Sequence, residues 1–161
     1  MGAPAMQAIG NVTLSSASAT IVFNNISQSY RDLRLVVTVI GGSNFNQSLR
    51  FNSDTGTNYN RVSMAGNDIG SAVSSSNTSV DQLYGGVAGS QPASNIYDIL
   101  DYSATDKHKS TLCRTNVMDS SFMYVQATAG RWASTSAITS ITVMGGTFGI
   151  GSSFTLFGVL A

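Results

Sequence analysis

The sequence predicts a single all-β domain, and three observations support that class. Only 10% of the 161 residues are charged, all eight acids are aspartate, and there are two lysines. A chain with this composition lacks the usual material of exposed helix faces. Its polar residues are mainly Ser, Thr and Asn, which suit strands and turns. Short alternating runs recur at the spacing of about 8 to 12 residues that is typical of sandwiches and barrels.

The first predicted strands lie in the N-terminal third of the chain. Residues 8–14 and 19–23 are β-prone runs separated by small polar residues, and we expect them to form a first hairpin. In residues 32–40 leucine and valine occupy every second position, while the other face is only partly polar. This pattern places the strand near the centre of a sheet. Residues 47–52 follow as another short strand.

A turn and two longer polar segments occupy the middle of the chain. In residues 52–58, Asp54 can hydrogen-bond the local backbone and Gly56 can adopt a positive φ. Residues 66–79 and 85–94 are rich in Gly, Ser and Asn, and we expect both to be exposed loops. They flank a short strand at residues 80–84.

The C-terminal part predicts the centre of the sandwich. Residues 95–102 have apolar side chains on both faces and form a core strand, and residues 111–118 pair with 122–129 around Asp119 and Ser120. Within residues 132–160, two β-rich runs flank a glycine-rich connector, which predicts a half-buried antiparallel hairpin. About ten strands result. We assign residues 1–17 to an N-terminal arm with the first strand, and 18–161 to the sandwich, in one domain.

Charge and hydropathy disfavour several classes of function. The formal net charge is zero and the longest basic cluster is Lys107 to Lys109, whereas nucleic-acid binding requires a concentrated positive face. No run approaches the roughly 20 apolar residues of a membrane helix, and no secretion signal is recognisable. The single Cys113 forms no intramolecular disulfide. We therefore expect a soluble protein without nucleic-acid or membrane partners.

Candidate catalytic residues are few. His108 is the only histidine, and Asp101, Asp106 and several serines lie nearby in the sequence, so a hydrolytic triad can be drawn. A histidine between two lysines in a polar turn is more simply a solvated residue, and no Gly-x-Ser-x-Gly motif occurs. A thiol site from Cys113 and His108 is disfavoured as well, because residues five apart on a strand face opposite sides.

Aspartates and aromatic residues supply the remaining candidates. Asp98 and Asp101 lie at an odd spacing that separates them on a strand, so ion pairs with Arg34, Arg50 or Arg114 are expected instead of an acid pair. A calcium site could form from Asp54, Asn52 and Asn58, although a hydrogen-bonded turn explains them more simply.

Stacking on a sugar is the other possibility for the aromatic residues. The candidates for it are Trp132, Tyr59, Tyr84, Tyr97, Tyr102 and Tyr124. A single tryptophan more often fills space in a core or an interface. We expect no catalytic, cofactor-binding or metal site and no enzymatic activity.

Five motifs resemble, in the same order, small stand-alone virion proteins of tailed bacteriophages, many of them from marine and cyanobacterial phages. The motifs are YRDLRL at 30–35, LRFNSDTGTNY at 49–59, IYDILDY at 96–102, RW at 131–132 followed by AITSIT at 137–142, and SSFTLFG at 152–158. The likeness extends over residues 18–160. It implies a jelly-roll-like β-sandwich displayed on the phage particle, either on the capsid surface or on a tail fibre.

Two functions from different classes follow from this resemblance. The first is a capsid decoration, or cement, protein that binds the major capsid protein on the outer surface of the virion after synthesis in the bacterial cytoplasm. The second is a fibre tip that binds host polysaccharide through the loops at 66–79 and 85–94. We expect a homotrimer formed through residues 33–40 and 96–102. Attachment to the particle should use residues 1–7 and the two loops.

Overall fold

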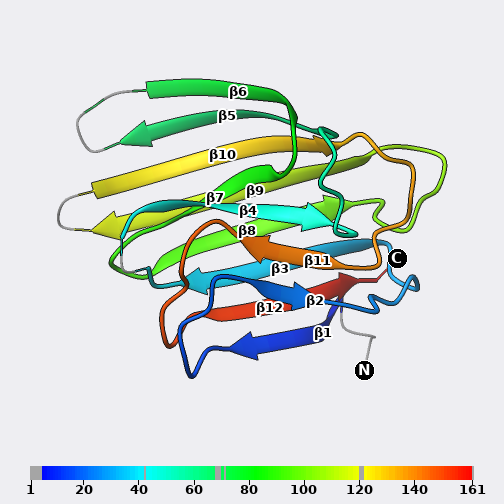
Figure 1. Cartoon of the computed structure of the whole chain (residues 1–161), viewed down its shortest axis with the longest axis horizontal. Coiled ribbons are helices and arrows are strands. Elements are labelled where there is room, and N and C mark those ends of the chain that lie inside the picture. Colours follow the sequence, from blue (N-terminus) through cyan, green and yellow to red (C-terminus); the bar gives the residue numbers. More distant parts are fainter. Residues whose placement is uncertain (1–4, 42, 68–69, 71, 120–121, 161) are drawn as a thin grey trace.

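The computed structural model describes residues 5–41, 43–67, 70, 72–119 and 122–160, which form twelve β-strands and no helix (Figure 1). They lie in two antiparallel sheets of eight and four strands. The larger sheet contains, in spatial order, β1 (Met6–Thr13), β12 (Ser153–Val159), β3 (Asp32–Val39), β8 (Ala93–Leu100), β9 (Lys109–Asp119), β10 (Phe122–Trp132), β5 (Tyr59–Asn67) and β6 (Ala72–Val80). The smaller sheet contains β2 (Ile21–Phe23), β11 (Ile141–Met144), β4 (Phe45–Phe51) and β7 (Leu83–Ala88). The predicted antiparallel sandwich is confirmed.

Eight of these strands have the connectivity of a jelly roll. Four antiparallel pairs join strands that are far apart in the sequence: β1 with β12, β2 with β11, β3 with β8 and β4 with β7. The first and third pairs lie in the larger sheet, and the second and fourth lie in the smaller sheet. Successive pairs thus alternate between the sheets, as they do when a long antiparallel ribbon is wound into a jelly roll.

The remaining four strands continue the larger sheet beyond the jelly roll, and we call them the extension. The β9–β10 hairpin follows β8 in the chain, and the β5–β6 hairpin follows β4. The two hairpins pair side by side through β10 and β5, so that β6 becomes the outer edge of the sheet (Figure 1). Of the smaller sheet, β7 packs against the extension, where it contacts β9, β10 and β5.

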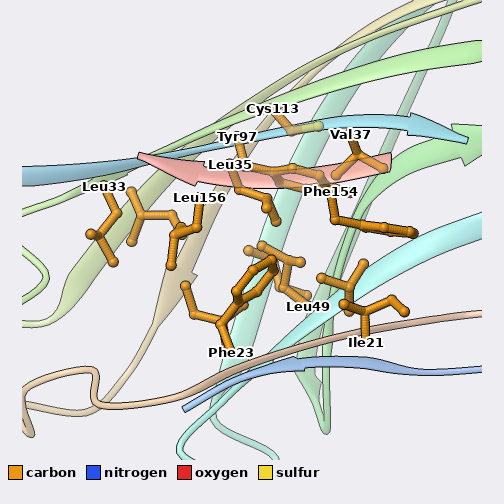
Figure 2. Packing of buried hydrophobic residues seen from close by; sticks show 14 of the residues in the cluster. Ile21, Phe23, Leu33, Leu35, Val37, Leu49, Tyr97, Cys113, Phe154 and Leu156 are labelled. Carbon is orange, nitrogen blue, oxygen red and sulfur yellow. The ribbon is translucent and has the colours of Figure 1, made fainter. Parts of the chain in front are cut away.

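The jelly-roll strands enclose a hydrophobic core between the two sheets (Figure 2). The inward side chains of β3 have no exposed surface: Leu33, Leu35, Val37 and Val39. The smaller sheet contributes Ile21, Phe23 and Leu49 to the same cluster. Burial of one such side chain is worth about 1.5–3 kcal/mol relative to exposure. The alternation in residues 32–40 therefore correctly predicts the buried face of β3.

The hairpin predicted within residues 132–160 is wrong in its pairing. β11 pairs with β2 and β4 in the smaller sheet, whereas β12 pairs with β1 and β3 in the larger one. The glycine-rich connector crosses between the sheets and buries Phe148 completely. Gly145 and Gly151 have φ values of 134° and 85°, which favour glycine. Alternation specifies which face of a strand is buried, but its partner is decided by contacts distant in the sequence.

The predicted first hairpin is wrong for the same reason. β1 pairs with β12 in the larger sheet, and β2 pairs with β11 in the smaller sheet. The two strands still lie close together, because a Cβ added at Gly10 would be 2.8 Å from the Phe23 ring. The strands themselves are located correctly, and the error lies in assuming that neighbours in sequence are neighbours in a sheet.

Both predicted loops are largely strands. β6 occupies most of 66–79, of which residues 68, 69 and 71 lie outside the described residues, and β7 extends to Ala88 within 85–94. Gly85 and Gly86 lie against Tyr97, and a Cβ at either position would be 2.6 Å from that side chain. These glycines mark a close approach of the two sheets and not a loop. The predicted pairing of 111–118 with 122–129 is confirmed as β9–β10; Ser120 lies outside the described residues.

Candidate interaction surface

The structure does not bring the candidate catalytic residues together. His108 is exposed in the turn before β9, whereas Cys113 is 2% exposed in the middle of that strand. Burial raises the pKa of the Cys113 thiol to about 12, so the thiol stays protonated at neutral pH. The Sγ atom lies 3.7 Å from the Thr115 hydroxyl, and no base lies among the partners found for it. These positions explain Cys113 as a small core residue.

The two candidate carboxylates make separate ion pairs. Asp98 on β8 lies 2.6 Å from Nε of Arg34 and 3.7 Å from a guanidinium nitrogen of Arg114, as predicted. Asp101 instead contacts Lys107 at 3.5 Å, and both of those side chains are about half exposed. The expected arginine partner for Asp101 is therefore wrong. A two-carboxylate acid–base site is not assembled here.

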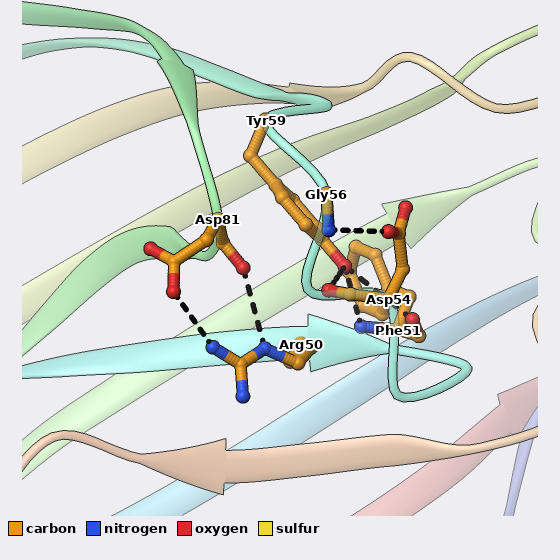
Figure 3. Close-up of polar contacts among 6 residues, drawn as sticks. All are labelled: Arg50, Phe51, Asp54, Gly56, Tyr59 and Asp81. Atoms are coloured by element: carbon orange, nitrogen blue, oxygen red, sulfur yellow. Dashed lines mark hydrogen bonds and ion pairs between the residues drawn. The ribbon is translucent and has the colours of Figure 1, made fainter.

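The candidate calcium ligands form a hydrogen-bonded turn between β4 and β5 (Figure 3). The Asp54 carboxylate accepts hydrogen bonds from the Gly56 N–H at 2.8 Å and the Asn58 amide at 2.9 Å. The indole N–H of Trp132 donates to the same carboxylate at 2.7 Å. Partial burial acts to raise the pKa of Asp54, but these hydrogen bonds outweigh it and lower the pKa. The positive φ predicted for Gly56 is found instead at Asn52 and Ser53.

Asn52 also stabilises the turn by hydrogen bonding through its side chain. Its side-chain oxygen accepts from the Thr139 and Ser140 N–H groups at 2.8 and 3.1 Å. Within the part of the chain that the structure describes, no three His, Cys, Asp or Glu side chains lie close enough to hold a metal ion. The turn thus ties the start of the extension to the segment before β11.

The predicted aromatic residues mostly lie in the core. Trp132 is 2% exposed, with its ring stacked on Tyr59 at a centroid distance of 6.3 Å. Tyr59, Tyr97 and Tyr102 have no exposed surface. Burial raises the pKa of the Tyr59 hydroxyl to about 12. These rings are unavailable for stacking on a sugar.

Lys109, at the end of the polar turn predicted around His108, is buried. Its side chain has no exposed surface, and Nζ donates to the carbonyls of Ala104, Lys107 and Thr135 at 2.6, 2.9 and 3.3 Å. Desolvation lowers the pKa of the amine. Three carbonyl acceptors match the three N–H donors of an ammonium group, so the side chain acts as a structural tie around the β8–β9 turn.

The inner face of the extension, which is turned toward the smaller sheet, is rich in polar residues. Its buried members include Ser63, Thr111, Thr115, Gln126 and Thr128. They bond to one another and to neighbouring strands: the Ser63 and Ser75 hydroxyls are 2.8 Å apart, and Gln126 donates to Thr128. A buried polar group is tolerated when it is hydrogen-bonded.

The outer face of the extension carries apolar residues. Strand register places one set on that face, and we call it the outer apolar surface: Val62, Met64, Leu112, Met118, Met123 and Val125. Their exposed fractions run from 40% at Met123 to 70% at Met64. Ala127 and Ala129 lie between them on β10. Tyr59, Cys113, Val117 and Trp132 are buried on the inner face as well, so the extension departs from the pattern of one layer of an isolated sandwich in having apolar side chains on its outer face too.

A shallow groove of about 630 Å³ runs across this surface beside β6. The residues that line it include Met64, Gly66, Ala72, Val125 and Ala127. Among the described outward residues of the extension, the charged ones are Arg114 and Arg131, and Arg114 is paired with Asp98. The surface is thus apolar, grooved and nearly uncharged, which is typical of a protein-binding patch.

The comparisons with known proteins add no relative. No protein-family model, curated protein or solved structure matches the chain. Among the residues that the structure describes, none belongs to a helix with the length and apolarity to cross a membrane. The geometry of the outer apolar surface is therefore the main structural guide to function.

Proposed function

We propose that this protein is a non-enzymatic structural protein of a bacteriophage virion that decorates the outer surface of the capsid. It would bind the major capsid protein lattice through the outer apolar surface and stabilise the shell. The apolar outer face of the extension carries this proposal, because six Val, Leu and Met side chains face outward while several hydroxyl and amide groups face the smaller sheet. The resemblance of the five ordered motifs to phage virion proteins supports a location on the phage particle.

The size of the outer apolar surface is suited to a protein partner. Each of its six side chains leaves on the order of 100 Å² exposed, which gives about 600 Å² in total, and a standard interface buries about 800 Å² per partner. The neighbouring alanines and the polar rim supply the remainder. This contact replaces the predicted attachment through residues 1–7 and the loops at 66–79 and 85–94, since both loop segments are largely committed to strands and residues 1–4 lie outside the described residues.

A fibre tip that binds host polysaccharide is the competing function. Sugar recognition commonly uses an exposed aromatic face that stacks on the ring. None of the six members of the outer apolar surface is aromatic, and Trp132 is in the core. Aliphatic side chains without fixed polar partners favour a protein surface over a hydroxylated sugar.

Binding of the purified protein to phage particles that lack it tests the proposal. Val125→Lys should weaken binding at least tenfold, because it places a charge at the centre of the contact. Val22→Lys is the matched control, since Val22 is 47% exposed on the smaller sheet and Val125 is 61% exposed. Both variants should keep the unfolding temperature of the parent protein.

Salt and copy number complete the test. Binding should persist at 1 M sodium chloride, where the Debye length is about 3 Å, because an apolar contact is screened little. Decoration requires many copies per particle. Equal binding of Val125→Lys and the parent protein would contradict the proposed contact, and binding to host polysaccharide with only a handful of copies per particle would establish the fibre-tip function.

A further inference from the structure

β6 is an unusually open strand for an edge of a β-sandwich. It forms one border of the larger sheet and pairs with β5 on one side only. None of its nine residues is buried, and seven are exposed. Its sequence, Ala-Val-Ser-Ser-Ser-Asn-Thr-Ser-Val, contains no charge and no proline. The backbone N–H and C=O groups on its open side therefore face solvent without the side chains that usually block such an edge.

Uninterrupted pairing is shorter at the other three sheet edges than at β6. β1 has an irregular register between Ala8 and Gly10, and β2 is only three residues long. β7 has an irregularity opposite Gln47 and Ser48 and packs against the extension. Bulges, short strands and covered edges are the common means of preventing edge-to-edge association. β6 also has a register irregularity, opposite Tyr59 to Arg61, but it lies at the C-terminal end of the strand, and residues 72–77 pair with residues 61–66 of β5 in continuous register.

The contacts within one molecule give β6 little support. Its side-chain bonds are to β5: the Arg61 guanidinium donates to Asn77 at 2.8 Å, and the Ser63 and Ser75 hydroxyls are 2.8 Å apart. Serine and asparagine favour strands weakly, and β6 packs only Val80, at its C-terminal end, in part against the core, so it gains little from the hydrophobic effect. A second strand on the open side would double the backbone pairing of β6.

We propose that two copies of this protein pair through β6 in antiparallel orientation, joining their larger sheets into one continuous sheet about a two-fold axis. An open edge can pair with another strand, and a two-fold axis places backbone N–H groups of one copy opposite C=O groups of the other. Residues 72–77 place only Ala, Val, Ser and Asn across the axis, so no like charges meet. The groove beside β6 would continue from one copy to the other. This pairing does not depend on the proposed capsid role.

The expected affinity follows from the small contact. Pairing of six residues buries on the order of 400 Å² per copy, about half of a standard interface. We therefore expect a dimer with a dissociation constant in the micromolar range or above, strengthened wherever copies are held close together. A trimer through β3 and β8 stays a prediction and competes with this dimer, and the mass of the assembly distinguishes them.

Sedimentation equilibrium of the full chain over a range of micromolar concentrations tests the pairing. The parent protein should show a concentration-dependent dimer. Ser74→Lys should weaken association at least tenfold, because it sets two ammonium groups near the axis. Ser16→Lys is the matched control, since Ser16 is an exposed residue between β1 and β2, far from β6 in the sheet order, and it should associate like the parent.

Cross-linking gives a second measurement that does not depend on the lysine variant. Cys113 is buried, so single cysteines introduced by Ser74→Cys, Ser75→Cys and Ser76→Cys can be joined by a short bis-maleimide. We expect covalent dimers from these variants and none from Ser16→Cys at the same concentration. A monomer at all concentrations, a trimer, a dimer that Ser74→Lys leaves intact, or equal cross-linking at Ser16→Cys would each overturn the pairing.

Discussion

The jelly roll and the extension use the same alternating pattern, but only the extension has a set of apolar side chains exposed on its outer face. Val37 on β3 points toward the smaller sheet and has no exposed surface, whereas Val125 on β10 points outward and is 61% exposed. The difference follows from what lies across the core. Four strands of the smaller sheet cover the jelly roll, whereas the extension is covered mainly by β7, with Phe51 of β4 packing on Tyr59 and Trp132. Stability should thus reside mainly in the jelly roll and binding in the extension.

The largest expected difference is between apolar truncations in the two regions. Phe154→Ala removes a fully buried ring that packs 5.0 Å from Phe148 between centroids, and it should lower the free energy of unfolding by about 3–5 kcal/mol. Met64→Ala, at a residue that is 70% exposed, should change it by about 0.5 kcal/mol or less. Urea unfolding measures both values, and equal losses would refute the division of roles.

Glycine substitutions should separate the regions next. A Cβ at Gly86 would lie 2.6 Å from the Tyr97 hydroxyl and 2.7 Å from Asn95 and Gln47, so Gly86→Ala should cost about 1–3 kcal/mol. At Gly66 in the extension the nearest atom would be 3.8 Å away, on Val125. Gly66→Ala should therefore be neutral or slightly stabilising in thermal unfolding. A larger loss from Gly66→Ala than from Gly86→Ala would contradict the close approach of the sheets.

A matched valine pair gives a smaller effect. Val37→Thr buries a hydroxyl in the core and should cost about 1–3 kcal/mol if the hydroxyl finds no partner. Val125→Thr exposes the same hydroxyl to water and should leave the free energy of unfolding nearly unchanged. Chemical denaturation of the two variants checks this, and comparable destabilisation would show that the outer face is covered even in the isolated molecule.

The smallest effect concerns the turn that links the two regions. The pKa of Asp54 is lowered in the folded protein, so its contribution to stability is present above the ordinary value of 3.8 and is lost as the pH falls through the folded-state pKa. Asp54→Asn should therefore lower the unfolding temperature near neutral pH but not in strong acid. Thermal unfolding of both proteins against pH measures the difference, and a difference independent of pH would rule out the charge as its source.

Local patterns predict the strands and their buried faces well. The alternation of leucine and valine in residues 32–40 correctly identifies the core side of β3, and the turn at Asp54 forms through its predicted backbone bond. The pairings of β1, β2, β11 and β12 could not be predicted in the same way, because each strand of a jelly roll pairs with a strand distant in the sequence. They depend on contacts between residues that are far apart in the sequence.

The sequence shows the alternation that produces the outer apolar surface, but it does not show that these side chains are exposed. Val62 and Met64 alternate with Arg61 and Ser63, which shows that β5 has one apolar face. Burial of that face is the usual expectation. In the extension the apolar face of β5 is exposed instead, because the polar face lies toward β7 and its side chains are hydrogen-bonded. This arrangement depends on where the smaller sheet ends. Gly85 and Gly86 predicted a loop for a related reason. Their role in β7 depends on the contact with Tyr97, which is far away in the sequence.

The buried amine of Lys109 makes the molecule suitable for labelling at one defined lysine. The chain has two lysines, and the side chain of Lys107 is 52% exposed while that of Lys109 is enclosed. The lowered pKa of Lys109 does not make it reactive, because a reagent cannot reach it in the folded protein. Among the lysine side chains, an amine-directed dye or gold cluster would thus attach at Lys107, in the β8–β9 turn. That position lies outside both surfaces proposed for binding, so the label would mark the location of the protein in an assembly without occupying its contacts.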